Sequence, residues 1–161
     1  MAFRLRDFRP EDLERVIYIN RTCLPENYSS YFFMSVHKNF PDLFLVAEED
    51  GEIVGYIMCR VERGFLHRWS GKAPKGHVIS IAVLPEHRRK GIATALLKEA
   101  LARMSERYGA GECYLEVRVS NTPAISLYRK LGFEETKVVP HYYLDGEDAY
   151  IMTKVLERDN P

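Results

Sequence analysis

Apolar residues recur along the chain at two different spacings. Across residues 91–108 they return every three or four positions, which is the period of an α-helix with one buried face. Across residues 114–119 they alternate with polar residues, which is the period of a half-buried β-strand. Similar patterns predict strands over 3–8, 44–47, 53–61, 77–83, 133–143 and 149–156, and helices over 10–20, 29–39 and 121–131.

The order of these elements predicts the fold class. Two Asp-Gly pairs indicate tight hairpins, whereas helix 91–108 connects strands 77–83 and 114–119. Strands joined through a helix in this way are parallel, and the crossover is right-handed. We therefore predict an α/β (α+β) fold with a mixed, mostly antiparallel sheet, one parallel pair and helices on both faces. Residues 62–76 carry neither periodicity and are predicted to be a loop.

Composition narrows the class of protein without naming a ligand. The 161 residues are 46% hydrophobic and 29% charged, which is typical of a single globular domain over residues 1–161. Lys plus Arg and Asp plus Glu are 23 each, so net charge favours neither specific nucleic-acid binding nor membrane binding. No apolar run approaches the roughly 20 residues that span a bilayer, and the first residues lack a signal core. We therefore expect a cytoplasmic protein.

Three widely spaced cysteines, Cys23, Cys59 and Cys113, do not form a disulfide framework or a zinc knuckle. We expect them to be ordinary thiols in a reducing compartment, and we predict no metal site.

Residues 88–93, Arg-Arg-Lys-Gly-Ile-Ala, lie between a predicted strand and the longest predicted helix. Gly91 lets a ligand approach the backbone, and the first amides of a helix lack internal partners and carry partial positive charge. With three adjacent cations, this turn is a candidate pyrophosphate cradle. The alternative is a basic helix start with a convenient glycine. A dinucleotide or P-loop signature is not present.

Residues 79–93 resemble the acyl-CoA motif of the GNAT N-acetyltransferases. The family pattern Arg/Gln-x-x-Gly-x-Gly/Ala is matched by Arg88, Gly91 and Ala93. A second family element, Asn121 followed by residues 128–133, stands at the expected distance. The chain is similar to this family in its order of elements over essentially its whole length, which implies the GNAT fold.

The resemblance implies acetyl-CoA as the cosubstrate. Its pyrophosphate would lie on the amides around Arg89 to Thr94, its pantetheine arm would pair with Ile81–Val83, and the amide of Val83 would polarise the thioester. Tyr128 would protonate the departing thiolate; the alternative is an aromatic on the buried face of its helix. The implied cofactor-binding residues are Ile81, Ala82, Val83, Arg88, Arg89, Gly91, Ile92, Ala93, Thr94, Asn121, Tyr128 and Lys130.

Two further segments resemble the signature loops of the N-terminal acetyltransferases, above all the NatA catalytic subunit and its archaeal relatives. We call residues 24–28 the first loop and residues 142–150 the second loop. The resemblance implies acetylation of the α-amine of protein N-termini that start with Ser, Ala, Thr or Gly, with Met starts as an extension. For Tyr28, Tyr142 and Tyr143 in these loops, packing in the core is the alternative role. The implied substrate-binding residues are Leu24, Pro25, Glu26, Tyr28, Arg118, Tyr142 and Tyr143.

Three residues are candidates for the general base: Glu26, His77 and Glu116. Alternation places Glu116 with Tyr114 and Arg118 on one face of its strand, where an acid is costly unless paired or near water. His77 and Glu116 are therefore expected to share a water and relay a proton. The alternatives are an ion pair for Glu116, a strand-start histidine for His77 and a helix cap for Glu26.

Other activities and partners stay open on sequence alone. A ribosomal-protein, lysine or small-amine acetyltransferase would keep the cofactor motif, and so would a non-catalytic acyl-CoA-binding subunit. Residues 60–76 hold five cations against Glu62, a local net charge of +4 that suits ribosome association; a solvated loop is the alternative. An auxiliary subunit is plausible but is not required.

Overall fold

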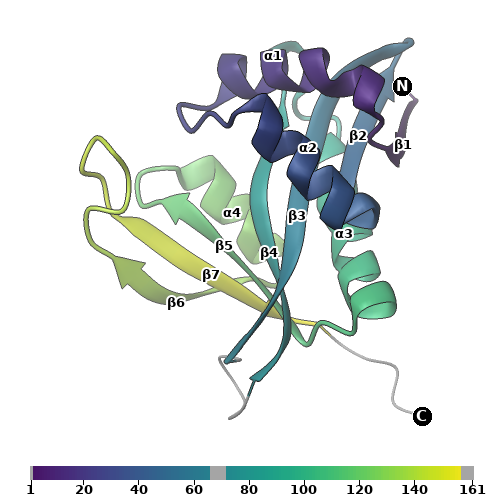
Figure 1. Ribbon diagram of the computed structural model, residues 1–161. Helices are drawn as coiled ribbons and strands as arrows, with labels where there is room; N and C mark the ends of the chain where they lie inside the picture. The colour runs from purple at the N-terminus through teal and green to yellow at the C-terminus, as the bar shows by residue number, and fades with distance from the viewer. Residues whose placement is uncertain (1, 66–71, 157–161) are drawn as a thin grey trace. The chain divides into compact units, whose positions relative to one another are not determined.

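The computed structural model describes residues 2–65 and 72–156, which form a seven-stranded sheet in the order β1-β2-β3-β4-β5-β7-β6 (Figure 1). The strands are β1 (Phe3–Asp7), β2 (Phe44–Glu49), β3 (Glu52–Phe65), β4 (Lys72–Val83), β5 (Glu112–Arg118), β6 (Glu134–Val139) and β7 (Ala149–Val155). The helices are α1 (Leu13–Cys23), α2 (Ser30–Asn39), α3 (Ile92–Tyr108) and α4 (Thr122–Lys130). This mixed α/β architecture confirms the predicted class.

The predicted parallel pair is present. β4 pairs in parallel with β5, with Gly76 opposite Cys113 and His77 opposite Tyr114. The pairs β1–β2, β2–β3, β5–β7 and β6–β7 are antiparallel. None of the helices in the described ranges is long and apolar enough to cross a membrane.

The predicted loop over residues 62–76 is wrong where the structure describes it, because β3 continues to Phe65 and β4 begins at Lys72. Residues 66–71 lie outside the described residues. The strand ends carry polar side chains such as Glu62 and Lys75, so they show no alternation of apolar and polar positions. Non-local backbone pairing and contacts with β5 stabilise them instead.

The chain folds into two compact units, and both β3 and β4 run through each of them. The first unit contains residues 2–60 and 78–104, and the second contains residues 61–65, 72–77 and 105–156. The units are described separately below.

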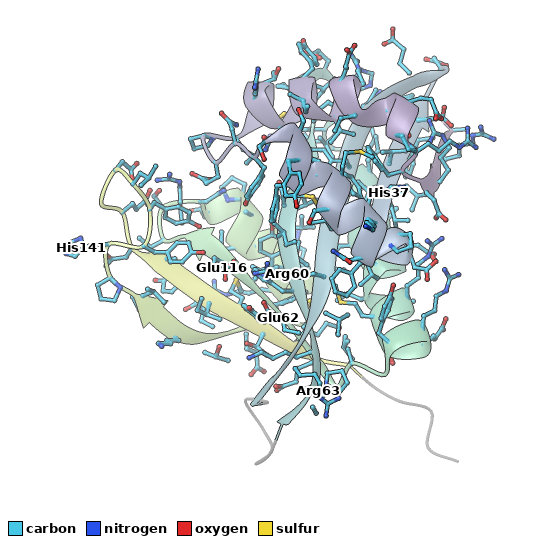
Figure 2. The ribbon with its side chains drawn as sticks, in the orientation of Figure 1. His37, Arg60, Glu62, Arg63, Glu116 and His141 are labelled. Carbon is cyan, nitrogen blue, oxygen red and sulfur yellow. The ribbon has the colours of Figure 1, made fainter. Side chains whose placement is uncertain are left out.

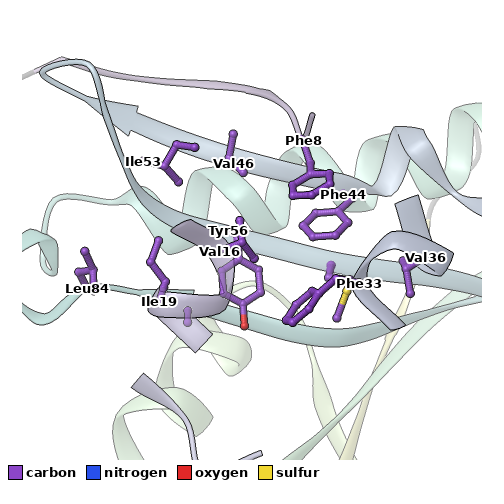
Figure 3. Close-up of a cluster of buried hydrophobic side chains, with 12 residues drawn as sticks. Phe8, Val16, Ile19, Phe33, Val36, Phe44, Val46, Ile53, Tyr56 and Leu84 are labelled. Atoms are coloured by element: carbon purple, nitrogen blue, oxygen red, sulfur yellow. The ribbon is translucent and has the colours of Figure 1, made fainter. Parts of the chain in front are cut away.

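In the first unit, α1 and α2 cover one face of the strands and α3 covers the other (Figure 1). Figure 3 shows the cluster under α1 and α2, in which Phe44 lies at the centre of an aromatic group. The members of this cluster are Phe8, Val16, Ile19, Phe33, Val36, Phe44, Val46, Ile53, Tyr56, Met58, Ala82 and Leu84. Burial of this apolar surface fixes the ends of α1 and β4, the two segments that lead into predicted site residues.

Arg6 of β1 and Asp12 form a partly buried ion pair. The guanidinium of Arg6 donates two hydrogen bonds to Asp12, at 2.7 and 2.9 Å, and the backbone N–H of Arg9 donates a third at 2.8 Å. Burial alone would raise the pKa of Asp12, but the hydrogen bonds and charge of Arg6 and Arg9 outweigh it and hold that pKa below its ordinary value.

We expect Asp12→Asn to lower the free energy of unfolding by about 1.5–3 kcal/mol at pH 7, because it removes a carboxylate that accepts charge-assisted hydrogen bonds. Since the pKa of Asp12 is lowered by folding, its contribution is complete above the unfolded value of about 3.9 and is lost as the pH falls through the folded value. Urea unfolding of wild type and variant at pH 7 and at pH 3 measures the loss of stability and its dependence on pH. A difference between wild type and variant that is equally large at both pH values would contradict this assignment.

Candidate active site

The turn between β4 and α3 has the backbone of an anion cradle. Arg89 and Gly91 both adopt positive φ, at 65° and 84°, and the carbonyl of Gly91 accepts the N–H of Ala95 at 3.0 Å. The N–H groups of residues 92–94 therefore precede the first hydrogen bond within α3, and they carry the positive end of a 17-residue helix. The sequence predicted a helix start with free amides here, and pyrophosphate binding at this turn stays a prediction.

The basic side chains of this turn are partly committed to the protein itself. The Nε of Arg88 donates to the carbonyl oxygen of Val83 at 2.8 Å, which ties the turn to the end of β4. The ammonium of Lys90 binds both carboxylate oxygens of Glu49, at 2.9 and 3.1 Å, and His87 contacts the same carboxylate at 2.5 Å. Hydrogen bonds from Lys90 and His87 hold the pKa of Glu49 below its ordinary value. Lys90 thus ties the turn to Glu49 at the end of β2.

We expect Glu49→Gln to weaken coenzyme A binding roughly tenfold, because it leaves Lys90 without its buried counterion and loosens the turn. Asp50→Asn is the matched control, since it removes one negative charge from the exposed neighbouring position. Isothermal titration with coenzyme A gives both dissociation constants. Equal affinity for the two variants would contradict the bracing role of Glu49.

Gly55 of β3 packs closely against the end of β4 and the start of α3. A Cβ at this position would lie 3.1 Å from the carbonyl oxygen of Ala82, 3.1 Å from the side chain of Val83 and 3.5 Å from that of Ile92. Three residues expected to contact the cofactor therefore pack around a space that a larger side chain would fill.

Asn20, which sequence reasoning missed, holds the first loop in place. This fully buried amide donates to the carbonyl of Glu26 at 3.0 Å and to the hydroxyl of Tyr56 at 3.1 Å, and it accepts the N–H of Tyr28 at 3.4 Å. Tyr56 in turn shares a 2.6 Å hydrogen bond with Ser80 of β4. A buried polar residue needs such partners, and only its place on the apolar side of the first helix hinted at this role.

Tyr28 and Glu26 occupy different surroundings within this loop. The ring of Tyr28 stacks on Phe32, and its hydroxyl donates to the carbonyl of Ile79 at 3.3 Å, so Tyr28 combines packing with a hydrogen bond to β4. Glu26 is half-buried. The cap of α2 is Ser29, whose hydroxyl accepts the N–H of Phe32. The helix-cap alternative for Glu26 is therefore not needed.

In the second unit, the parallel pairing of β4 and β5 brings His77 against Glu116. The Nε2 of His77 lies 2.8 Å from Oε1 of Glu116, and the histidine side chain is buried (Figure 2 labels Glu116). Glu116 thus pairs with His77, while Arg118 of the same strand pairs elsewhere. A buried imidazole in contact with a carboxylate can hold a proton and pass it on.

Arg118 organises the second loop. Its guanidinium binds the carboxylates of Asp145 at 2.8 Å and Glu147 at 2.9 Å and lies 4.1 Å from the centre of the Tyr143 ring. Tyr143 meets Tyr142 edge to face at 4.9 Å, and Tyr142 stays exposed. The structure therefore brings together the three predicted substrate-binding residues of this unit, with Arg118 as the anchor of the loop.

The predicted residues of α4 are spread along the helix. Tyr128 is buried beside Phe133, and burial raises its pKa to about 12, so its hydroxyl keeps its proton at neutral pH. The side chain of Asn121 caps the helix by accepting the N–H of Ala124 at 3.3 Å. Lys130 is exposed and lines an open cavity of about 410 Å³.

Comparison with known proteins shows the family to which the chain belongs. Residues 13–133 match the model of the acetyltransferase (GNAT) family. The chain belongs to the GNAT family. An N-alpha-acetyltransferase of Sulfurisphaera tokodaii is 56% identical to it over 156 residues, which cover 96% of this chain and 93% of the relative. The N-terminal acetyltransferase A complex catalytic subunit NAA10 of Arabidopsis thaliana is 40% identical over 149 residues, covering 91% and 74% of the two chains.

A solved GNAT structure supports the choice of cosubstrate. The crystal structure of Arabidopsis thaliana NAA60 in complex with acetyl-CoA matches with a TM-score of 0.84 at 25% identity, covering 96% of this chain and 99% of that one. These comparisons confirm the predicted GNAT fold, the use of acetyl-CoA and the class of enzyme, an N-terminal acetyltransferase. Such enzymes act on protein N-termini. The roles of individual residues stay predictions.

Proposed function

We propose that the enzyme acetylates the α-amine of protein N-termini by direct attack on acetyl-CoA, with His77 and Glu116 as the proton-accepting pair. The observation that carries this proposal is the 2.8 Å contact between their side chains on the parallel pair of strands. The pair accepts the proton directly or through one water. Glu26 is the alternative base because it lies in the first loop.

The proposed reaction assigns a residue to each proton transfer and to the binding of the thioester. The amine nitrogen forms a bond to the acetyl carbon as the carbon–sulfur bond breaks, and His77 takes the proton that the amine loses. The backbone of Ile81–Val83 holds the pantetheine arm, and the amide of Val83 polarises the carbonyl. Tyr128 supplies a proton to the departing thiolate, and the phenolate regains a proton from solvent as His77 releases the one it took from the amine. Burial raises the pKa of Tyr128 to about 12, so the phenol is protonated before transfer and its phenolate is reprotonated readily afterwards.

The acceptor chemistry suits a modest base. An α-amine has a pKa of about 7.7–8.0, against about 10.4 for a lysine side chain. The neutral α-amine is therefore roughly 3.4 kcal/mol easier to reach near pH 7. This difference favours an N-terminal acceptor over a lysine for a site that uses an imidazole–carboxylate pair.

The residue at position one sets the acceptor range. We propose that Ser, Ala, Thr and Gly starts are preferred and that Glu26 in the first loop extends the range to Met starts. As substrate-binding residues we propose Leu24, Pro25 and Tyr28 of the first unit and, in the second unit, Tyr142 and Tyr143, which would bind the backbone of the acceptor peptide. Peptides that differ only at position one test this range by mass spectrometry of the products. The absence of product from Met-Leu and Met-Glu peptides would reject the extension to Met.

Ribosome association through residues 60–76 is a separate proposal. Of its basic residues, Arg68 lies outside the described residues, together with His67, while the ammonium of Lys75 lies over the ring of Tyr114 at 4.8 Å. Sedimentation with ribosomes at low and high salt tests it, and absence from the pellet at both would reject it. An auxiliary subunit is allowed by this proposal and is not required.

We also propose a cytoplasmic location and a single catalytic domain. The side chain of Cys23 is half-buried and those of Cys59 and Cys113 are buried, which suits ordinary structural thiols.

A further inference from the structure

His77 is enclosed by more than its partner Glu116. On the other side of the imidazole, Oε2 of Glu62 from β3 lies 3.8 Å from Nδ1. The ring of Tyr114 from β5 lies flat against the imidazole, with centroids 4.3 Å apart and planes 6° apart. The Nδ1 atom is buried and has no hydrogen-bond partner within residues 2–65 and 72–156. All four residues belong to the second unit (Figure 2 labels Glu62 and Glu116).

Tyr114 connects these groups through two separate contacts. Its hydroxyl donates a 2.7 Å hydrogen bond to Oε1 of Glu62, while its ring stacks on His77. The ammonium of Lys75 from β4 lies 4.8 Å from the centre of the same ring. One side chain therefore sets the plane of the imidazole and also fixes the carboxylate that faces Nδ1.

The second carboxylate has a specific effect on proton transfer. When His77 accepts the proton of the amine, both ring nitrogens become donors. Glu116 is in contact with one nitrogen and Glu62 faces the other, so each carboxylate stabilises the positive charge that forms. Without Glu62, the buried Nδ1 side of the imidazolium would lose the negative charge that faces it, which is costly.

We propose that Tyr114 and Glu62 are positioning residues for His77, which orient its ring and stabilise the imidazolium that forms during acetyl transfer. This inference rests on the proposed role of His77 as proton acceptor. Among the described residues, Glu62 of β3 and Tyr114 and Glu116 of β5 face the imidazole, while Lys75 of β4 contacts the ring of Tyr114.

Two conservative variants test the proposal by kinetics. Tyr114→Phe keeps the ring and removes the hydroxyl, and Glu62→Gln keeps the shape and removes the charge. At saturating acetyl-CoA we expect kcat to fall by roughly tenfold in each, by analogy with the loss of outer partners of functional histidines, with no change in KM for acetyl-CoA. We also expect the acid limb of kcat/KM to move to lower pH, further in Glu62→Gln, because the protonated imidazole loses support.

A matched control and a double variant separate this role from a structural one. Glu52→Gln changes an exposed carboxylate of the same strand and should leave the profile unchanged. In a His77→Ala background, Glu62→Gln should have no further effect on kcat, because coupled residues are not additive. Wild-type rates and an unshifted profile in both Tyr114→Phe and Glu62→Gln would overturn the proposal. A loss of folded protein with an unshifted profile would also overturn it.

An NMR titration tests the same coupling without turnover. The ring signal of His77, assigned by its absence in His77→Ala, should titrate with a midpoint at lower pH in Glu62→Gln than in wild type. An identical midpoint would overturn the inference even in an active enzyme. If wild type fails to acetylate peptides while this midpoint moves, the proposed function fails and the coupling stands.

Discussion

Replacement of His77 by alanine should lower kcat by about two to four orders of magnitude, the usual contribution of a positioned general base. The effect should fall on kcat and on kcat/KM for the peptide alike, because a base acts in the transition state and not in substrate binding. The KM for acetyl-CoA should stay close to wild type, because the proposed binding groups for the cosubstrate are backbone amides of residues 89–94, which the substitution leaves in place. Steady-state rates with a Ser-starting peptide measure both constants.

Glu116→Gln completes this test. The amide keeps the shape of the side chain but carries no charge to stabilise an imidazolium across the 2.8 Å contact with His77. We therefore expect kcat to fall in this variant as well. Glu134→Gln, which changes an exposed carboxylate of β6, is the matched control and should keep full activity. Unchanged turnover in both His77→Ala and Glu116→Gln would assign the base to Glu26 or to bulk water.

Phe44→Ala should lower the free energy of unfolding by about 3–5 kcal/mol, the usual cost of emptying a buried phenylalanine site. Phe44 is fully buried, stacks on Phe8 at 4.0 Å, and lies 6.2 Å from Phe33 and 6.5 Å from Tyr56 between ring centroids. The loss reaches the first loop, because Phe33 contacts Tyr28 edge to face at 6.0 Å. Urea unfolding with a common m-value measures the change.

Phe44→Leu is the control for this prediction. It retains most of the apolar volume and should cost less than about 1.5 kcal/mol. Equal destabilisation by the leucine and alanine variants would show that ring stacking matters more than filled volume. A loss below about 1 kcal/mol in the alanine variant would contradict the central place of Phe44 in the core.

Local patterns were sufficient to predict the parallel pair of strands and the turn that precedes α3. The period of α3, the alternation in β5 and the glycine at position 91 are all local signals. Binding of the cosubstrate at this turn stays a prediction. The ends of β3 and β4 could not be predicted in this way. Their strand pairing joins residues far apart in sequence, and side chains such as Glu62 gave no apolar alternation.

The same limit applies to the candidate site. The sequence suggested that His77 and Glu116 lie close together, because strand parity and parallel pairing are both general rules. Glu62 and Tyr114 were missed because their contact joins positions 52 residues apart. Arg118 was expected to bind substrate, and its contacts with Asp145 and Glu147 give it a further role in the second loop. The contacts of Glu62, Tyr114 and Arg118 depend on which side chains the tertiary fold brings together, and this cannot be read from local sequence patterns.

The most direct test of the central claim is to locate the acetyl group on a peptide that carries both a free α-amine and an internal lysine. The enzyme is incubated with acetyl-CoA and a Ser-starting peptide, and tandem mass spectrometry assigns the added mass to a residue. We predict that the acetyl group is on the α-amine and that the lysine is unmodified. Acetylation of the lysine alone, or of neither amine, would contradict the assignment of this enzyme as an N-terminal acetyltransferase.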